Sequence, residues 1–411
     1  MPALSRVGTA FFLGKKSGGG AAQPGEAIFH ADKWYQDSTW NATTEYNWIV
    51  PAGVTEISVV CVGGGGSGEP RHDGASGGGA GLAYKNNLAV TPGSTVVVRV
   101  GGGGAQSNWD NAGFDGIRSE IVVDGIVYAN AGGGRKGEDH GTSGYLDNTS
   151  YGHPGSATDK YDGGGKGGRG YHQSGCRQSG GGVGGYSNSP DNGNGAEGGD
   201  CGNPSYAGTN ASGGANGAGG AGVSANGCTS YYASGGGGVG MYGRGANGAA
   251  GSASWDEITP TGKGGSYDPW TYDTSGIFPN VGYIHNTGLR GYACDSSWNN
   301  WANPGSSTPT GSGSNGTDLL LGSESTRVYR RNNATQGQGQ TRPDGGFPGG
   351  GGGGGHGGCP AGYGGHGCVR IVWGTINGMK REFPTQGVNK TDEYPGLSGA
   401  TIDENGKQMM Y

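Results

Sequence analysis

The sequence is poor in the residues from which most folded enzymes are built. Hydrophobic residues make up 31% and charged residues 14% of the 411 positions, against roughly 45–50% apolar (with glycine) and about 25% charged residues in typical soluble domains. So little apolar material excludes a doubly wound sheet or a barrel of this length. No apolar run approaches the about 18–20 residues of a transmembrane helix. A net charge of −6 argues against nucleic-acid binding, which needs a positive patch.

Cysteine and an export signal are also scarce. The N-terminal sequence MPALSRVGTAFFLGKK lacks the continuous apolar segment of a signal peptide, so we expect synthesis in a cytoplasm without standard secretion. An odd number of cysteines in so long a chain does not form the dense disulfide framework of a small secreted domain. The seven cysteines are Cys61, Cys176, Cys201, Cys228, Cys294, Cys359 and Cys368.

Runs of β-branched residues predict strands, and no convincing helical period is present. In TEISVVCV, alternation places Ile57, Val59 and Cys61 on one face. Asp124-Gly125 lies between two apolar runs and is typical of a type I′ hairpin, in which both turn residues take positive φ. The expected strands are Tyr46–Val50, Thr55–Val62, Thr95–Val100, the two halves of Ser119–Ala129, and Cys368–Trp373.

These patterns predict an all-β fold with four parts. Residues 45–130 and 368–374 form a small antiparallel β-sandwich, and residues 131–367 are a glycine-rich insertion between its strands. A structureless loop of that length is incompatible with a compact domain, so the insertion needs a regular fold of its own. Residues 1–44 are expected to dock the protein on a larger assembly, and residues 375–411 form a polar C-terminal tail that is the alternative docking segment.

Glycine, with 102 residues, decides what the insertion can build. Collagen requires a strict Gly-X-Y period and abundant proline, whereas here the period slips and only 18 prolines are present. A silk-like sheet would require a period of two. Glycine at every third residue, as in Gly164, Gly167 and Gly170, favours the polyproline II conformation with three residues per turn. We therefore predict a bundle of short polyglycine II helices with residues 349–355 at its centre. Irregular glycine loops wrapped on the β-domain are the alternative.

Several segments together resemble known glycine-rich proteins. The opening YNWIVPAGVTEISVVCV carries the pattern W-x-V-P-x-G-V-x-x-I-x-V, followed by GLAYKNNLAVTPGSTVVVRVGGGG, GGGGVGMYGRGANGA, GHGCVRIVWGT and the ending KREFPTQGV. As a set they are similar to large glycine-rich virion proteins of marine cyanophages and related tailed phages, over about 45–130 and 235–388 in pieces. The resemblance implies a structural, tail-fibre-like protein.

Two other families share parts of the pattern. Phage tail-tip adhesins carry a polyglycine helix sandwich whose end loops bind host receptors, and the glycine-rich domains of anaplastic lymphoma kinase receptors join a tumour-necrosis-factor-like sandwich to polyglycine helices. Both resemblances imply the architecture predicted above. The chain departs from both in its aromatic-rich insert at 255–345 and in the cysteines at Cys61 and Cys368.

The aromatic-rich insert holds the residues expected to contact a partner. Rings beside Asn and Asp suit stacking on sugars, and aromatic residues are enriched at interfaces. By analogy with the adhesins, these loops contact a host glycan or a neighbouring virion subunit; alternatively they cap a glycine core that has no other hydrophobe. The residues are Trp255, Trp270, Tyr272, Tyr283, Tyr292, Trp298 and Trp301.

Other candidate sites are weaker. His356, Cys359, His366 and Cys368 are residue types that zinc binds, but their spacing matches no standard finger, so we expect no metal and no cofactor. Cys61 and Cys368 lie on strands that are expected to be neighbours, which makes them a candidate disulfide pair. The sequence contains no Ser-His-Asp motif, Walker loop or dinucleotide-binding glycine motif, and we expect no enzymatic activity.

The combined expectation is a phage virion structural protein, a fibre or tail-tip component for host attachment. It would be made in the host cytoplasm and exposed on the particle, with other virion proteins, a host glycan or receptor and copies of itself, as a trimer, as partners. Neither nucleic-acid binding nor membrane insertion is expected. The alternatives are a capsid decoration or neck fibre protein, a surface-polysaccharide depolymerase, and a secreted glycine-rich matrix protein. Paired carboxylates about 5–9.5 Å apart in a groove would favour the depolymerase.

Overall fold

The fold is built from strands and extended segments. The computed structural model describes residues 24–31, 43–69, 75–105, 113–137, 161–173, 177–188, 195, 216, 218–219, 232–245, 247–248, 345–354, 361–376 and 378–388, and the backbones of short strands at 252–253, 258–259, 293–295, 401–402 and 408–409. The described residues form strands and no helix, and the two large sheets are antiparallel. The all-β class is confirmed.

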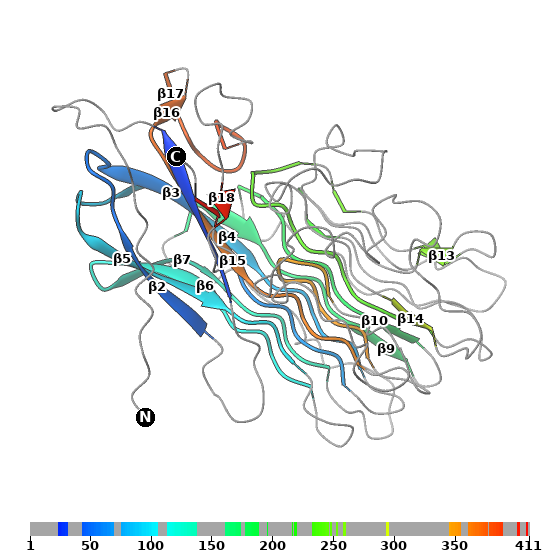
Figure 1. Ribbon diagram of the computed structural model, residues 1–411. Helices are drawn as coiled ribbons and strands as arrows, with labels where there is room; N and C mark the ends of the chain where they lie inside the picture. Colours follow the sequence, from blue (N-terminus) through cyan, green and yellow to red (C-terminus); the bar gives the residue numbers. More distant parts are fainter. Residues whose placement is uncertain are drawn as a thin grey trace, which may run out of the picture.

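Two large sheets lie together at one end of the molecule (Figure 1). Their strand orders are β1-β15-β3-β4-β8 and β2-β5-β6-β7. These strands are β1 (Gly25–His30), β2 (Thr43–Ile49), β3 (Glu56–Val62), β4 (Leu82–Ala89), β5 (Thr95–Gly101), β6 (Ser119–Val123), β7 (Ile126–Ala131), β8 (Gly163–Gly165) and β15 (Cys368–Trp373). The short strands are β9 (Tyr171–Gln173), β10 (Arg177–Ser179), β11 (Tyr232–Ser234), β12 (Ser252–Ala253), β13 (Ile258–Thr259), β14 (Ala293–Asp295), β16 (Thr375–Ile376), β17 (Met379–Lys380), β18 (Thr401–Ile402) and β19 (Gln408–Met409).

A single hydrophobic cluster joins the two large sheets. Alternating residues such as Val98 on β5 and Ile371 on β15 belong to it, because a period of two turns every second side chain to the same face. Trp48 of β2 is 1% exposed, and its ring lies 5.6 Å from that of Trp373 on β15, centroid to centroid. Of the two hydrophobic clusters of described residues, the larger therefore lies between these sheets.

The predicted strand patterns are confirmed where hydrophobic alternation is strong. Ile57, Val59 and Cys61 all belong to the cluster between the sheets, as their alternation predicts. The predicted hairpin joins β6 to β7, with φ of 50° at Asp124 and 78° at Gly125. Strand β15 has the predicted bounds.

Three strands of the five-stranded sheet have no such pattern. Strand β1 lies inside residues 1–44 and pairs with β15 along its whole length, from Gly25 opposite Trp373 to His30 opposite Cys368. Strand β4 has polar residues at its centre, and β8, from the glycine-rich insertion, consists of glycine and pairs with β4. Part of the predicted N-terminal segment and part of the insertion therefore belong to the sheet, while the docking role of residues 1–44 stays a prediction.

The predicted Cys61–Cys368 disulfide is wrong. Both thiols are free and buried. The register of β3 against β15 places Cys368 opposite Val62 and Cys61 opposite Val369. Neighbouring residues of a strand point to opposite faces, so Cys61 lies in the cluster between the sheets and Cys368 in a second cluster on the other face.

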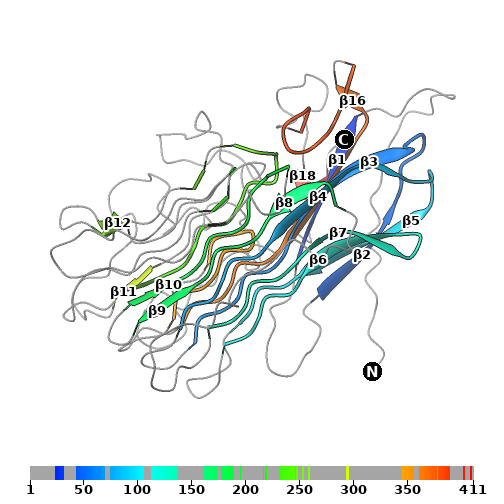
Figure 2. The ribbon, with the colours of Figure 1, turned by 180° about the vertical axis from the view of Figure 1, so that it is seen from behind.

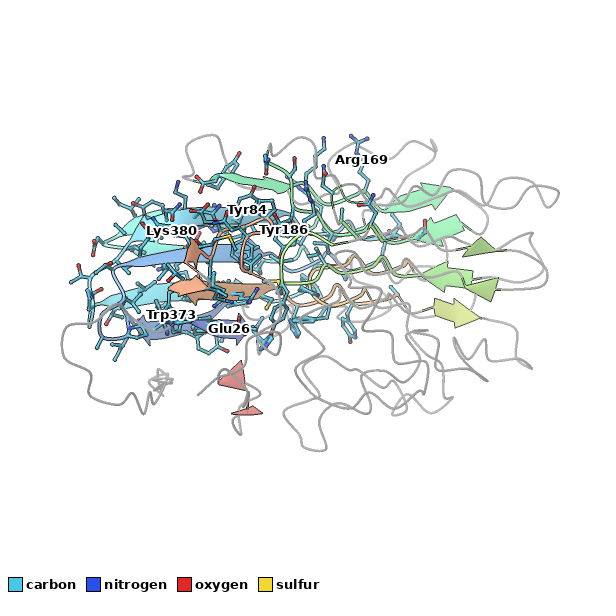
Figure 3. All side chains as sticks on the ribbon, turned by 90° about the horizontal axis from the view of Figure 1, so that it is seen from above. Glu26, Tyr84, Arg169, Tyr186, Trp373 and Lys380 are labelled. Atoms are coloured by element: carbon cyan, nitrogen blue, oxygen red, sulfur yellow. The ribbon has the colours of Figure 1, made fainter. Side chains whose placement is uncertain are left out.

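Glycine-rich segments continue from the strands and run side by side away from the sheets (Figures 1 and 2). Within the insertion, similar segments lie next to those that flank the strands. We call the whole set the glycine lattice, defined as residues 63–69, 75–81, 101–105, 113–118, 132–137, 166–170, 180–184, 236–240, 345–354 and 361–367. Figure 3 shows Tyr84 and Tyr186 near the point where the strands continue into the lattice.

Candidate functional site

The backbone hydrogen bonds of segment 63–69 repeat every three residues. Its amides donate in turn to three different segments, with N···O distances of 2.8–3.2 Å. Residues 63, 66 and 69 donate to segment 75–81, residues 64 and 67 to segment 113–118, and residues 65 and 68 to segment 361–367. Each amide thus points about a third of a turn from the one before, whereas strand amides alternate between two sides.

The carbonyl groups of the same segment face three further neighbours. Gly64 and Ser67 accept from segment 132–137, Gly65 accepts from Gly104, and Gly66 accepts from Gly352. Six segments therefore surround residues 63–69. Segment 75–81 repeats the arrangement, since its amides at 77–81 donate in turn to segments 349–352, 132–135 and Gly168.

The lattice leaves no space for a side chain at residues 64–66. A Cβ atom placed on Gly64, Gly65 or Gly66 would lie 2.1, 2.0 or 1.9 Å from a carbonyl oxygen of a neighbouring segment. The three oxygens belong to Gly102, Gly350 and Arg135, in three different segments. Only glycine permits this close approach of backbones, and the lattice is held by backbone hydrogen bonds where other proteins use packed side chains.

The glycines predicted at every third residue face one neighbour. Cβ atoms on Gly164, Gly167 and Gly170 would meet carbonyl oxygens of Leu82, Gly79 and Ser76 at 2.0–2.2 Å, all from one continuous stretch of chain. The described part of the predicted central run, residues 349–354, also lies inside the lattice. Its amides at 349, 351 and 352 donate to three other segments, and the Gly350 amide donates to Gly346 within the same segment.

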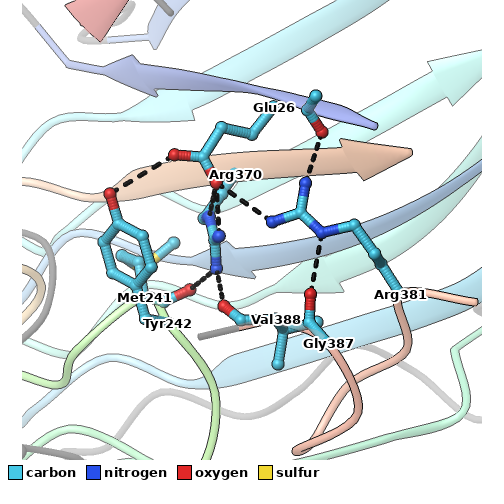
Figure 4. Close-up of polar contacts among 8 residues, drawn as sticks. Glu26, Met241, Tyr242, Arg370, Arg381, Gly387 and Val388 are labelled. Atoms are coloured by element: carbon cyan, nitrogen blue, oxygen red, sulfur yellow. Dashed lines mark hydrogen bonds and ion pairs between the residues drawn. The ribbon is translucent and has the colours of Figure 1, made fainter. Parts of the chain in front are cut away.

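A buried ionic cluster lies where the lattice meets the five-stranded sheet (Figure 4). Arg370 of β15 pairs with Glu26 of β1, and its Nη1 donates to the carbonyls of Met241 (3.0 Å) and Val388 (2.6 Å). Arg381 pairs with the same carboxylate at 3.3 Å. The cluster joins an N-terminal strand, a turn at the end of the lattice and the C-terminal tail.

The cluster satisfies charges that burial would otherwise make costly. Burial acts to raise the pKa of Glu26, but Arg370 and Arg381 outweigh it and hold that pKa below its usual value. Burial, with repulsion from Arg370, lowers the pKa of Arg381 to about 10. The guanidinium of Arg370 also lies over the ring of Tyr242, with Cζ 3.9 Å from its centroid, a cation–π arrangement.

The R-x-F-P-T sequence at 381–385 fastens the tail beside this cluster. Phe383 is 3% exposed and stacks on Tyr186, with ring centroids 6.0 Å apart. Its amide donates to Asn86 Oδ1 (2.8 Å), and Asn86 Nδ2 donates back to the Phe383 carbonyl (2.7 Å). Burial is the main cause that raises the pKa of Tyr84, beside these rings, to about 12. The sequence resemblance pointed to this motif but did not predict its buried position.

The predicted contact residues cannot be placed in this framework. Trp255, Trp270, Tyr272, Tyr283, Tyr292, Trp298 and Trp301 all lie outside the described residues, so their role in partner contact stays a prediction.

The predicted histidine and cysteine set is only partly described, since His356 and Cys359 lie outside it. The Nδ1 atom of His366 accepts from the Gly103 amide at 3.1 Å, and Cys368 Sγ lies 3.7 Å from His30 Nδ1. Among the described residues, no three His, Cys, Asp or Glu side chains are grouped so as to hold a metal ion. The same residues include no helix long and apolar enough to cross a membrane.

A family model described as a glycine-rich domain matches residues 41–276, more than half of the chain. The chain belongs to the glycine-rich domain family. The matched range of this glycine-rich domain ends before β15, which lies between β1 and β3 in the five-stranded sheet. The folded unit therefore extends beyond the matched residues at both ends. A comparison with curated proteins finds no match.

Proposed function

We propose that this glycine-rich domain protein is a phage virion structural protein, acting as a fibre or tail-tip component in host attachment. The observation that carries the proposal is the lattice in which segment 63–69 has six hydrogen-bonded neighbours. The shape of such a lattice is held by hydrogen bonds between backbone segments. This suits a stiff structural protein that must keep its form outside a cell. The sequence resemblance to cyanophage virion proteins supplies the biological setting.

The finer fold proposed with this function is a β-sandwich joined to a polyglycine II bundle. The cluster that the two large sheets share supports the sandwich. The three-residue hydrogen-bond period and the six neighbours support the polyglycine II conformation, because that helix has three residues per turn and no internal hydrogen bonds. A chain in this conformation depends on neighbouring segments for its backbone hydrogen-bond partners.

The proposed mechanism is mechanical and involves no chemistry on a substrate. The sheets and lattice hold the insert at 255–345, whose aromatic residues contact a host glycan or a neighbouring subunit. We propose other virion proteins and copies of the chain itself, in a trimer, as further partners, with synthesis in the host cytoplasm and exposure on the particle.

Labelling of purified particles tests the proposal. An antibody raised against residues 255–345, with preimmune serum as the control, is expected to mark fibres or the tail tip in electron micrographs. Label spread over the capsid would instead indicate a decoration protein, and label at the neck a neck fibre. Particles without label would refute the virion assignment and favour the matrix protein.

A variant pair tests the contact residues separately. Trp298→Ala with Trp301→Ala is expected to reduce binding to host cells or to the partner subunit while the thermal unfolding temperature stays unchanged. Ile126→Ala is the matched control, because Ile126 is 42% exposed on the β6–β7 hairpin of the sheet half. Equal binding by the tryptophan variant and the control would refute the contact role.

A further inference from the structure

The tail segment 381–388 closes over the junction between the sheet half and the glycine lattice. It follows the hairpin β16–β17, at which residues 378–380 are exposed. The segment is folded back on itself by two backbone hydrogen bonds between Glu382 and Gln386, at 2.7 and 2.8 Å. It pairs with no strand of the large sheets. Its contacts with the rest of the molecule are therefore made mainly by its side chains and by backbone groups that bind side chains of the site.

Three residues of this segment are buried, Arg381, Phe383 and Val388, and the first two make specific contacts. The Nη1 atom of Arg381 donates to the Gly25 carbonyl at 2.6 Å, and its Nη2 pairs with Glu26. Phe383 packs against the rings of Tyr84 and Tyr186, with centroid distances of 6.1 and 6.0 Å, and the two tyrosine rings are 6.4 Å apart. Arg381 pairs with a buried carboxylate and Phe383 packs on aromatic rings, as anchor residues of a bound peptide do.

Two asparagine side chains of β4 bind residues 382 and 383. Asn86 binds both the amide and the carbonyl of Phe383. Asn87 Nδ2 donates to Glu382 Oε1 at 2.7 Å. Asn87 takes a φ of 52°, a conformation that asparagine tolerates better than most residues. The polar centre of β4, which hides this strand in the sequence, thus forms one wall of the contact.

We propose that residues 381–388 are an intramolecular peptide ligand of this site, and that they act as a removable latch between the sheet half and the glycine lattice. The site belongs to β1, β4 and β15 and to the residues around Tyr186 and Met241. It takes a peptide of the form R-x-F-P, in which the arginine meets Glu26 and the phenylalanine meets the tyrosine pair. The inference concerns the folded chain and holds whether or not the protein is a virion component.

The latch joins parts of the chain that the sheets alone do not connect. The Val388 carbonyl and the Met241 carbonyl accept from the same Arg370 Nη1, and the Pro384 carbonyl accepts from the Arg244 amide at 2.7 Å. Every group of the site precedes the latch in the sequence. Removal of the latch therefore takes no group of the site away with it, and the proposal requires the site to stay folded without the latch.

Cutting the full chain tests whether the segment binds as a peptide. A protease recognition sequence is inserted in the β16–β17 turn at Gly378, and the folded protein is cut there. The C-terminal fragment is expected to co-elute with the body in native gel filtration, although no covalent bond joins them. Phe383→Ala and Arg381→Ala are each expected to release it at least about 100-fold faster, as loss of a buried anchor does. Thr385→Ala is the matched control, because Thr385 is exposed within the same motif.

Hydrogen exchange on the uncut chains separates latch release from unfolding. In Phe383→Ala, amides of residues 241–245 are expected to lose protection while those of β3 keep it. Release of the fragment from the cut wild-type protein as fast as from Phe383→Ala would overturn the proposal, as would equal retention in every variant. Loss of β3 protection on cutting would overturn it too, because a removable latch must leave its site standing.

Discussion

Replacing single glycines of segment 63–69 by alanine tests the packing of the lattice most directly. The methyl group of Gly66→Ala would lie 1.9 Å from the carbonyl oxygen of Arg135, whereas Cβ contacts closer than 3.0 Å are essentially never observed. One segment must therefore move by about 1 Å. The Arg135 carbonyl accepts from the Gly78 amide at 2.9 Å, and the adjacent Gly134 amide donates to Gly64 at 2.8 Å, so the movement disrupts two buried hydrogen bonds.

The expected cost is large for a change of one methyl group. Leaving a buried donor or acceptor without its partner costs about 1–3 kcal/mol, and alanine recovers up to about 1 kcal/mol by restricting the unfolded chain. Two disrupted bonds then give a net loss of about 1–6 kcal/mol, against the roughly 5–15 kcal/mol that stabilises a typical domain. Urea denaturation followed by tryptophan fluorescence measures this loss.

The pattern over three consecutive positions is more informative than any single value. Alternate positions would tolerate alanine in a sheet with one open face, and two in three would tolerate it in a helix with one inward face. In the lattice, Gly64, Gly65 and Gly66 each face a carbonyl of a different segment, so all three replacements should be similarly damaging. Gly93→Ala is the control, because nothing lies within 4 Å of its Cβ position and only its φ of 79° opposes alanine. A loss below about 1 kcal/mol at any of the three lattice positions would refute the six-neighbour packing.

Two pH limits follow from the buried groups. The pKa of Glu26 is lowered in the folded state. The stability that Glu26 contributes is therefore present above about pH 4.5 and is lost as the pH falls through the pKa of the folded state. Glu26→Gln should lower the stability at pH 7 by about 3–5 kcal/mol, because it leaves two guanidinium groups without a buried carboxylate. Burial raises the pKa of Cys61 and Cys368 above 9, so stability should fall above about pH 9 by about 1.4 kcal/mol per pH unit for each thiol. Burial likewise raises the pKa of Tyr84 to about 12, which adds to the loss above pH 10, whereas Arg381, with its pKa lowered to about 10, opposes it. Thermal unfolding of Cys61→Ala with Cys368→Ala should place the alkaline onset near pH 10, and an unchanged onset would contradict this origin.

Hydrophobic alternation predicts the strands that face the cluster between the sheets, and it fails for strands β4 and β8, whose residues make other kinds of contact. Strand β3 is visible because Ile57, Val59 and Cys61 repeat with a period of two. Strand β8 is three glycines and has no side chain to alternate. In β4 the central asparagines form hydrogen bonds with the tail segment and do not contribute to a hydrophobic face. The signal that hides β4 in the sequence is the one that marks the latch site.

The ionic cluster shows a second limit of local reasoning. Glu26 is buried and pairs with Arg370, which lies on the neighbouring strand but more than three hundred residues later in the sequence. Arg381 then adds a second positive charge to the same carboxylate. No pattern within either segment predicts such a pairing. The RxFP motif at 381–384 is the part of the cluster that a local pattern does show, because Arg381 and Phe383 stand two residues apart there.

Much of the glycine lattice, in contrast, can be predicted from composition. With one residue in four a glycine, collagen and silk are excluded by the missing periods of three and two, and short registers such as Gly164, Gly167 and Gly170 indicate which stretches approach another backbone. Their common neighbour, residues 76–82, could not be named in advance, because every glycine run offers the same donors and acceptors. Strand register supplies the missing information. Segments 63–69 and 361–367 are aligned because β3 and β15, which they flank, are paired by hydrophobic side chains, so the sheets fix the order in which identical glycine segments meet.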